Sequence, residues 1–112
     1  MEKLTHYRQL VQQILTEHNQ HKSAYGDVEQ YTLFDEKDDH YLLLSSGWYQ
    51  YRRIYGCLIH IDLKDNKIWI QYDGTEVGVA NELVSLGVPK QDIVLAFQAP
   101  YARKYTEFAV GE

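Results

Sequence analysis

The chain has 112 residues and a formal net charge of −5, with ordinary hydrophobic (45%) and charged (24%) content. That length supports one hydrophobic core, so we expect a single domain over residues 1–112. The acidic balance, with its densest basic pieces at Arg52-Arg53 and Arg103-Lys104, disfavours direct nucleic-acid binding by the isolated chain. One cysteine excludes an intramolecular disulfide, and no apolar run is long enough to span a membrane. We therefore expect a soluble, cytoplasmic protein with no membrane partner.

Residues 2–20 have the pattern of an amphipathic helix, with apolar side chains spaced three and four apart. The predicted buried stripe consists of Leu4, Tyr7, Val11, Ile14, Leu15 and His18. Tyr25, Gly26 and Asp27 break this pattern, and the hydrophobic period changes to two from Val28 onward.

Four strands follow, at residues 28–35, 40–46, 53–62 and 67–72. A polar turn at 36–39 joins the first two, and an aromatic link at 47–51 joins the next two. Because the links between successive strands are short and polar, they favour an antiparallel meander.

A second helix is predicted over residues 76–86, with Thr75 as its N-cap and Gly87 as its left-handed C-terminal cap. Residues 93–97 form a short fifth strand or buried segment, and the tail from Ala99 resembles a loop. We expect Tyr101, Tyr105 and Phe108 to pack back on the body of the protein. The predicted fold class is α+β, an antiparallel sheet with both helices on one face.

The third and fourth strands form a hairpin if the turn lies at Asp65-Asn66. This register places Asp62 opposite Trp69, His60 opposite Gln71 and Ile59 opposite Tyr72. Opposed residues share a face. The predicted core face holds Cys57, Ile59, Ile61, Leu63, Ile68, Ile70 and Tyr72, and the predicted non-core face holds Leu58, His60, Asp62, Lys64, Lys67, Trp69, Gln71 and Asp73.

This hairpin disfavours several chemistries. Cys57 and His60 point to opposite faces of one strand, so they cannot form a nucleophilic pair there. His60 and Asp62 share a face and make half of a metal site, but no further His or Cys stands at ligand spacing nearby, and Lys64 and Lys67 oppose a cation. We therefore expect no metal, no cofactor and no catalytic residue.

The non-core face is unusual because it combines polar groups with large aromatic side chains. A small domain that exposes tryptophan and leucine on a sheet face is a candidate for association with another protein or with itself. The candidate interface residues are Trp48, His60, Asp62, Trp69 and Gln71.

Several strings together resemble the XisI family of cyanobacterial proteins, which are called fdxN element excision controlling factors. These strings are YGCLIHID (55–62), KIWIQYDGTE (67–76), VANEL (79–83) and LGVPKQDIVL (86–95). The resemblance extends over nearly the whole chain. It departs from the usual pattern at Asn66, where glycine is common, and at the aromatic link Tyr49-Gln50-Tyr51.

The resemblance implies a non-enzymatic accessory protein that acts through protein contacts. Its named relative is required for programmed excision of a DNA element in heterocyst-forming cells, together with the partner XisH and a site-specific recombinase. We therefore expect a homo-oligomer with an XisH-like partner.

Two alternatives stay open at this point. The first is a small metal- or ligand-dependent enzyme that uses His60, Asp62 and Asp73. The second is a DNA-binding accessory factor in which Arg52, Arg53, Arg103 and Lys104 form one basic patch.

Overall fold

The computed structural model describes residues 2–20 and 27–111, and the predicted break at Tyr25 and Gly26 lies outside them. The elements in chain order are α1 (Glu2–Gln20), β1 (Asp27–Asp35), β2 (His40–Tyr49), β3 (Arg52–Lys64), β4 (Lys67–Asp73), α2 (Val79–Ser85), the short 3-10 helix η1 (Lys90–Asp92), β5 (Ile93–Leu95) and α3 (Pro100–Arg103).

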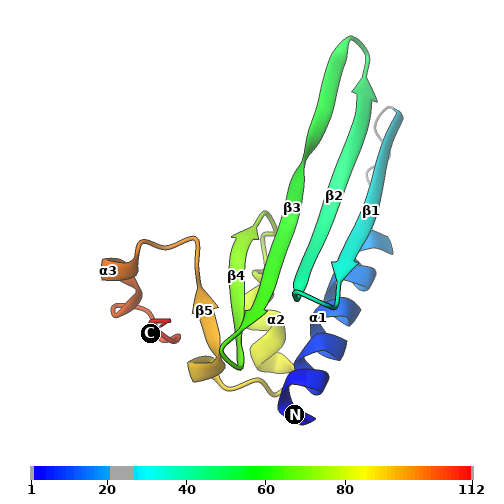
Figure 1. Cartoon of the computed structure of the whole chain (residues 1–112). Helices are drawn as coiled ribbons and strands as arrows, with labels where there is room; N and C mark the ends of the chain where they lie inside the picture. Colours follow the sequence, from blue (N-terminus) through cyan, green and yellow to red (C-terminus); the bar gives the residue numbers. More distant parts are fainter. Residues whose placement is uncertain (1, 21–26, 112) are drawn as a thin grey trace.

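The strands form one five-stranded sheet in the order β1-β2-β3-β4-β5, and the predicted α+β fold is confirmed (Figure 1). The first four strands pair antiparallel, as the meander predicted. β5 instead pairs parallel to β4, because α2 supplies the crossover connection that parallel neighbours need.

Both longer helices pack on one face of the sheet, which we call the inner face (Figure 1). The predicted α1 stripe is buried there, apart from the half-buried Leu4 and His18, and it meets the side chains of the central strands. The fully buried side chains of this core include Val11, Leu15, Tyr41, Leu43, Ile59, Ile61, Ile68, Ile70, Val79 and Leu83. Among the described residues, no helix is both long enough and apolar enough to span a bilayer.

The β3–β4 turn is confirmed at Asp65 and Asn66, which have φ angles of 55° and 60°. Two consecutive positive φ angles define the hairpin turn that normally prefers glycine, and asparagine tolerates that conformation. The register from Lys64 opposite Lys67 to Ile61 opposite Ile70 is as predicted.

Beyond Ile70 the predicted register is wrong, because a β-bulge makes Gln71 an extra residue. His60 therefore pairs with Tyr72 instead of Gln71, and Ile59 pairs with Asp73. The bulge moves Tyr72 off the core face, where it was predicted, and leaves it 51% exposed.

A second bulge lies between β2 and β3, where Leu43 pairs with Ile59 and Leu44 pairs with Cys57. Leu58 is the extra residue, and it packs against the main core instead of lying on the opposite face. Cys57 was predicted to be a core residue; its register places it opposite Leu44, away from the inner face, and it is half-buried. Burial raises the pKa of its thiol.

The β2–β3 hairpin is longer than predicted, because β2 continues to Tyr49 and β3 begins at Arg52. Only Gln50 and Tyr51 form the turn, and Gln50 takes the left-handed conformation with φ 56°. The expected aromatic link is therefore mostly strand, and the hairpin extends past the helices (Figure 1).

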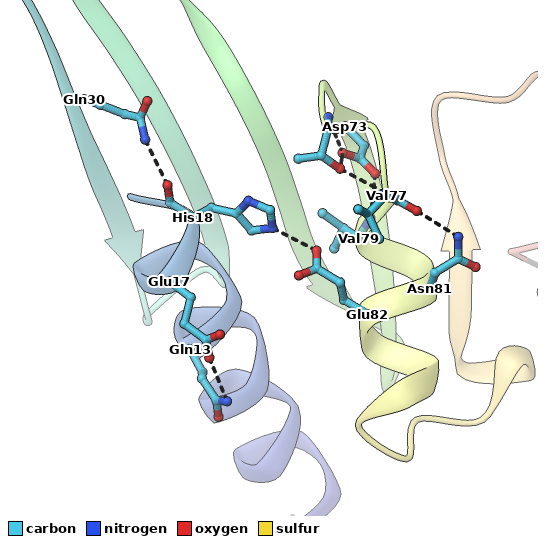
Figure 2. A network of polar contacts seen from close by, with 11 residues as sticks. Gln13, Glu17, His18, Gln30, Asp73, Val77, Val79, Asn81 and Glu82 are labelled. Atoms are coloured by element: carbon cyan, nitrogen blue, oxygen red, sulfur yellow. Dashed lines mark hydrogen bonds and ion pairs between the residues drawn. The ribbon is translucent and has the colours of Figure 1, made fainter. Parts of the chain in front are cut away.

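The predicted start of the second helix is wrong, since α2 begins at Val79 and its N-cap is Gly78, which offers no side chain. Asp73 replaces the predicted Thr75 cap by accepting a hydrogen bond from the Val79 backbone N–H at 2.7 Å (Figure 2). A carboxylate is stabilised at this end of a helix because backbone N–H groups there have no intrahelical partner. The predicted Gly87 cap is confirmed by its φ of 98°.

The C-terminal segment contains a short helix, α3, where a loop was expected. Phe108 packs against the main core, as predicted. Tyr101 and Tyr105 do not; they are 78% and 80% exposed.

Asp39 connects α1 to the sheet. Its carboxylate accepts two hydrogen bonds from the Arg8 guanidinium, at 2.7 and 3.0 Å, and one from the Tyr41 hydroxyl at 2.7 Å. Its backbone carbonyl accepts the Leu63 N–H at 3.0 Å. The Arg8 hydrogen bonds, with that of Tyr41, hold the pKa of the Asp39 carboxyl below its ordinary value although burial opposes them.

We predict that Asp39→Asn lowers the free energy of unfolding at neutral pH by roughly 1.5–3 kcal/mol, the range for a hydrogen bond to a charged group. Asparagine keeps the shape and tolerates the positive φ, but it loses the charge and half of the paired contact with Arg8. Urea unfolding monitored by tryptophan fluorescence measures the difference.

Because the folded-state pKa of Asp39 is depressed, this stabilisation is present above the unfolded carboxyl pKa of about 3.9 and is lost as the pH falls through the folded value. The difference in the free energy of unfolding between the unchanged chain and Asp39→Asn should therefore narrow below about pH 4. Glu36→Gln, in the same turn but exposed, is the control. If Asp39→Asn destabilises the protein no more than Glu36→Gln does, Asp39 does not stabilise the contact between α1 and the sheet.

Candidate functional site

The sheet face opposite α1 and α2, which we call the outer face, exposes large apolar side chains. The β1–β2 register places Tyr31 and Leu33 beside Leu44 and Leu42, which are half-buried. The large side chains that are exposed on this face come from four strands: Tyr31, Leu33, Trp48, Tyr55 and Tyr72. No described helix covers this part of the sheet (Figure 1).

Trp48 is the candidate residue that stands most openly on this face, with 51% of its surface exposed. The Arg53 guanidinium, from the directly opposed position on β3, lies 5.5 Å from its ring centroid. A half-exposed indole paired with an arginine is a common composition for an interface centre.

The edge strand β1 adds negative charge to the same face. Its outward positions alternate with the inner ones, so Asp27, Glu29 and Asp35 lie on the outer face with Tyr31 and Leu33. An apolar patch bordered by carboxylates complements a partner surface that is apolar with a basic border.

Trp69 lies on the outer side of β4 but is only 7% exposed. The C-terminal segment covers it, forming a small second core of Trp69, Val94 and Ala109. Its indole N–H donates to the Lys64 carbonyl at 3.0 Å, and the Lys64 ammonium lies 4.0 Å from the ring centroid. Trp69 is therefore buried within the protein, and the accessible part of the outer face belongs to β1, β2, β3 and the end of β4.

Arg103 holds this C-terminal segment in place by donating to the carbonyls of Gln98 and Ala96, at 3.0 and 3.2 Å. Arg103 is the last residue of α3, whereas Arg52 and Arg53 lie at the far end of the β2–β3 hairpin (Figure 1). The four basic residues considered for DNA binding do not form one patch.

His60 and Asp62 share the outer face as predicted, and a third residue joins them. His40, the first residue of β2, pairs with Asp62 across the β2–β3 ladder. Its Nδ1 lies 2.7 Å from Asp62 Oδ1, and the Nε2 of His60 lies 2.8 Å from the same oxygen. The three ligand-type atoms lie within 4.8 Å of one another.

Spacing along one strand missed His40, because it comes from a neighbouring strand 22 positions away in sequence. The predicted turn at 36–39 was the available signal, because it makes His40 the first residue of β2. Pairing β2 with β3, in addition to β3 with β4, would have placed His40 near Asp62. The hydrogen bond to Asp62, with the nearby charges of Asp62, Asp35 and Asp38, raises the pKa of His40.

Asp73 does not join this cluster. The Gln71 bulge places it opposite Ile59, an inner-face residue, where both carboxylate oxygens are used to order the start of α2. The predicted grouping of His60, Asp62 and Asp73 therefore does not form. Gln71 is half-buried at the bulge itself.

Two of the shallow hollows on the inner face have contrasting linings. One, of about 270 Å³, lies between α1 and α2 and includes Gln13, Glu17 and Asn81 in its lining. Beside it, His18 and Glu82 join the two helices with a contact of 2.8 Å (Figure 2). The other, of about 300 Å³, is mostly apolar and is lined by Val28, Gln30, Ser45, Tyr49, Arg52, Ile54 and Leu58.

We predict that Trp69→Ala lowers the free energy of unfolding by about 3 kcal/mol, the lower end of the range for deleting a buried tryptophan. The substitution removes the packing of Val94 and Ala109 and the hydrogen bond to Lys64. Thermal or urea unfolding measures it. Trp48→Ala, which removes a half-exposed indole, should cost far less; equal costs for the two variants would show that Trp69 is not buried as described.

We predict that Asp62→Asn lowers the pKa of His40, as measured by NMR titration of the histidine ring signals. The hydrogen bond and charge of Asp62 are the main causes of the raised value, and Asp35 and Asp38 contribute less. The ring signals of His6, which is exposed on α1, serve as the internal reference. An unchanged His40 pKa would mean that the contact with Asp62 does not form in solution.

The family model described as "XisI protein" matches residues 1–110. The crystal structure of a XisI-like protein from Anabaena variabilis is 44% identical, with a TM-score of 0.92, and the match covers 96% of this chain and 99% of that one. The crystal structure of the fdxN element excision controlling factor XisI from the same organism is 34% identical, with a TM-score of 0.85, and the match covers 97% and 99%. No curated protein matches. With the family model matching nearly the whole sequence and the fold shared with both solved relatives, this chain belongs to the XisI family.

Proposed function

We propose that this chain is a non-enzymatic accessory factor that acts through protein contacts, and that its outer face binds an XisH-like partner. In this proposal the pair assists a recombinase in the excision of a DNA element. One solved relative is described as an fdxN element excision controlling factor, and at 34% identity the match covers nearly all of both chains.

The observation that carries the proposal is the accessible outer face. Five large apolar side chains are at least one-third exposed there, whereas α1 and α2 cover much of the other side of the same sheet. Contiguous exposure of this kind on a small domain is typical of a binding surface. Four of the five are tyrosine or tryptophan, the types that are enriched at interface centres.

Charge supports a heterologous partner over pairing of two outer faces. The chain carries a net charge of −5, and Asp27, Glu29 and Asp35 border the apolar patch. Complementary charge accelerates association and selects the partner. A partner with a basic nucleic-acid-binding surface would meet this border favourably.

Self-association is a second part of the proposal and uses other surfaces. Several tyrosines away from the outer face are almost fully exposed, among them Tyr51, Tyr101 and Tyr105. Their apolar rings and polar hydroxyls suit contacts between copies of the chain. The mass of the purified chain in solution tests this part separately.

The two alternative functions have less support. The enzyme hypothesis required His60, Asp62 and Asp73 to converge, and Asp73 caps α2 on the inner side. The DNA hypothesis required one basic patch, and Arg103 binds backbone carbonyls far from Arg52 and Arg53. Binding of duplex DNA by the isolated chain at low salt would support the DNA hypothesis.

The decisive experiment measures the affinity of the purified chain for the XisH-like protein of the same genome by isothermal titration calorimetry. We predict that Trp48→Ala and Tyr55→Ala each weaken binding by about 30-fold, which corresponds to a hot-spot loss of about 2 kcal/mol. Both side chains are more than half exposed, so their truncation leaves the core intact.

Val77→Ala and Leu86→Ala are the controls, since they shorten exposed apolar side chains that line the hollow between α1 and α2, on the other side of the sheet. Circular dichroism establishes that all four variants are folded. The proposal fails if no complex forms, or if the control substitutions weaken the complex as much as those on the outer face.

A further inference from the structure

We propose that His40, His60 and Asp62 form a binding site for one divalent transition-metal ion of the Zn²⁺ or Co²⁺ type on the outer face. This inference is independent of the proposed partner. It concerns a cluster that the sequence disfavoured because its third ligand comes from another strand.

The geometry fits such an ion after a small adjustment. Both histidine nitrogens lie within 2.8 Å of one Asp62 oxygen, and all three ligand atoms lie within 4.8 Å of one another. A tetrahedral ion with ligand bonds of 2.0–2.2 Å separates its ligand atoms by about 3.4 Å. Each histidine nitrogen therefore has to retreat from the carboxylate oxygen by less than about 1 Å, and the two nitrogens have to come from at most 4.8 Å apart to about 3.4 Å.

The ligands stand on adjacent strands that are already paired. His40 and Asp62 are direct partners in the β2–β3 ladder, and His60 lies two residues before Asp62 on β3. Strands hold side chains more firmly than loops, so little ordering is needed on binding. The site is also reachable, because the His40 side chain is 50% exposed.

Donor chemistry selects the class of ion. Two imidazole nitrogens and one carboxylate oxygen suit Zn²⁺, Co²⁺, Ni²⁺ or Cu²⁺, whereas Ca²⁺ and Mg²⁺ prefer sets made of oxygen. Three protein ligands leave at least one position for water or for a side chain of a bound protein.

The surrounding charges favour a cation. Asp35 and Asp38 act on His40 from the neighbouring turn, and both are negative. Lys64, which counted against a metal in the sequence, places its ammonium 4.0 Å from the Trp69 ring centroid. The charge of Lys67 also acts on Asp92, which forms an ion pair with Lys3 of α1.

The site is tested by titrating the tag-free chain with Co²⁺, which reports tetrahedral coordination through its visible absorption. We predict one ion per chain, and affinity at least 10-fold weaker in His40→Gln, His60→Gln and Asp62→Asn. Displacement of Co²⁺ by Zn²⁺ and no response to excess Mg²⁺ are also expected. Exposed His6→Gln on α1 is the matched control and should bind as the unchanged chain does.

Two results would overturn the proposal. One is the absence of a saturable Co²⁺ signal from folded, unchanged protein at a pH where the histidines are neutral. The other is a signal that survives in a folded His40→Gln, His60→Gln double variant, since the ion would then be held elsewhere. Neither result bears on partner binding, which is measured separately through Trp48 and Tyr55.

Discussion

The contact between Asp39 and Arg8 links the layers of this protein. It ties α1 to the start of β2, while the Asp39 carbonyl accepts the Leu63 N–H of β3. Tyr41, whose hydroxyl donates to the Asp39 carboxylate, faces the inner layer, and because side chains alternate along a strand its neighbour His40 faces the opposite side. Asp39 and Tyr41 thus close the inner layer at the start of β2, and His40 lies beside Asp62.

The helices pack on one side of the sheet, and this determines which side chains are accessible for binding. α1 and α2 cover much of the inner face and the C-terminal segment covers Trp69, which among the described residues leaves Leu33, Trp48 and Tyr55 exposed on the outer side. Two β-bulges then decide which side chains are displayed there. The bulge at Leu58 turns that leucine into the core, and the bulge at Gln71 turns Tyr72 outward and Asp73 inward. The composition of the open face and the histidine cluster both depend on which face of the sheet each strand residue points to.

Periodicity predicted α1, the antiparallel strands, the Asp65-Asn66 turn and the Gly87 cap, because each depends on local spacing or on one residue's backbone preference. Periodicity could not predict the bulges. An extra residue leaves the apolar alternation of Ile59 and Ile61 unchanged, but it reverses the face to which the residues beyond it point. Trp69 lies on the predicted face, but its burial was missed, because whether a sheet face is open depends here on a tail 40 residues further along. His40 was missed because its partners are contributed by a neighbouring strand.

Side-chain footprinting of the chain alone and in complex with the proposed XisH-like partner tests directly whether the outer face is the binding surface. Hydroxyl-radical oxidation followed by mass spectrometry reports the exposure of each aromatic ring. The account predicts that Trp48, Tyr55 and Tyr72 become protected in the complex while Tyr101 and Tyr105 keep their reactivity. Protection of Tyr101 and Tyr105, with Trp48 and Tyr55 unchanged, would place the partner beside α3 and contradict the assignment of the outer face.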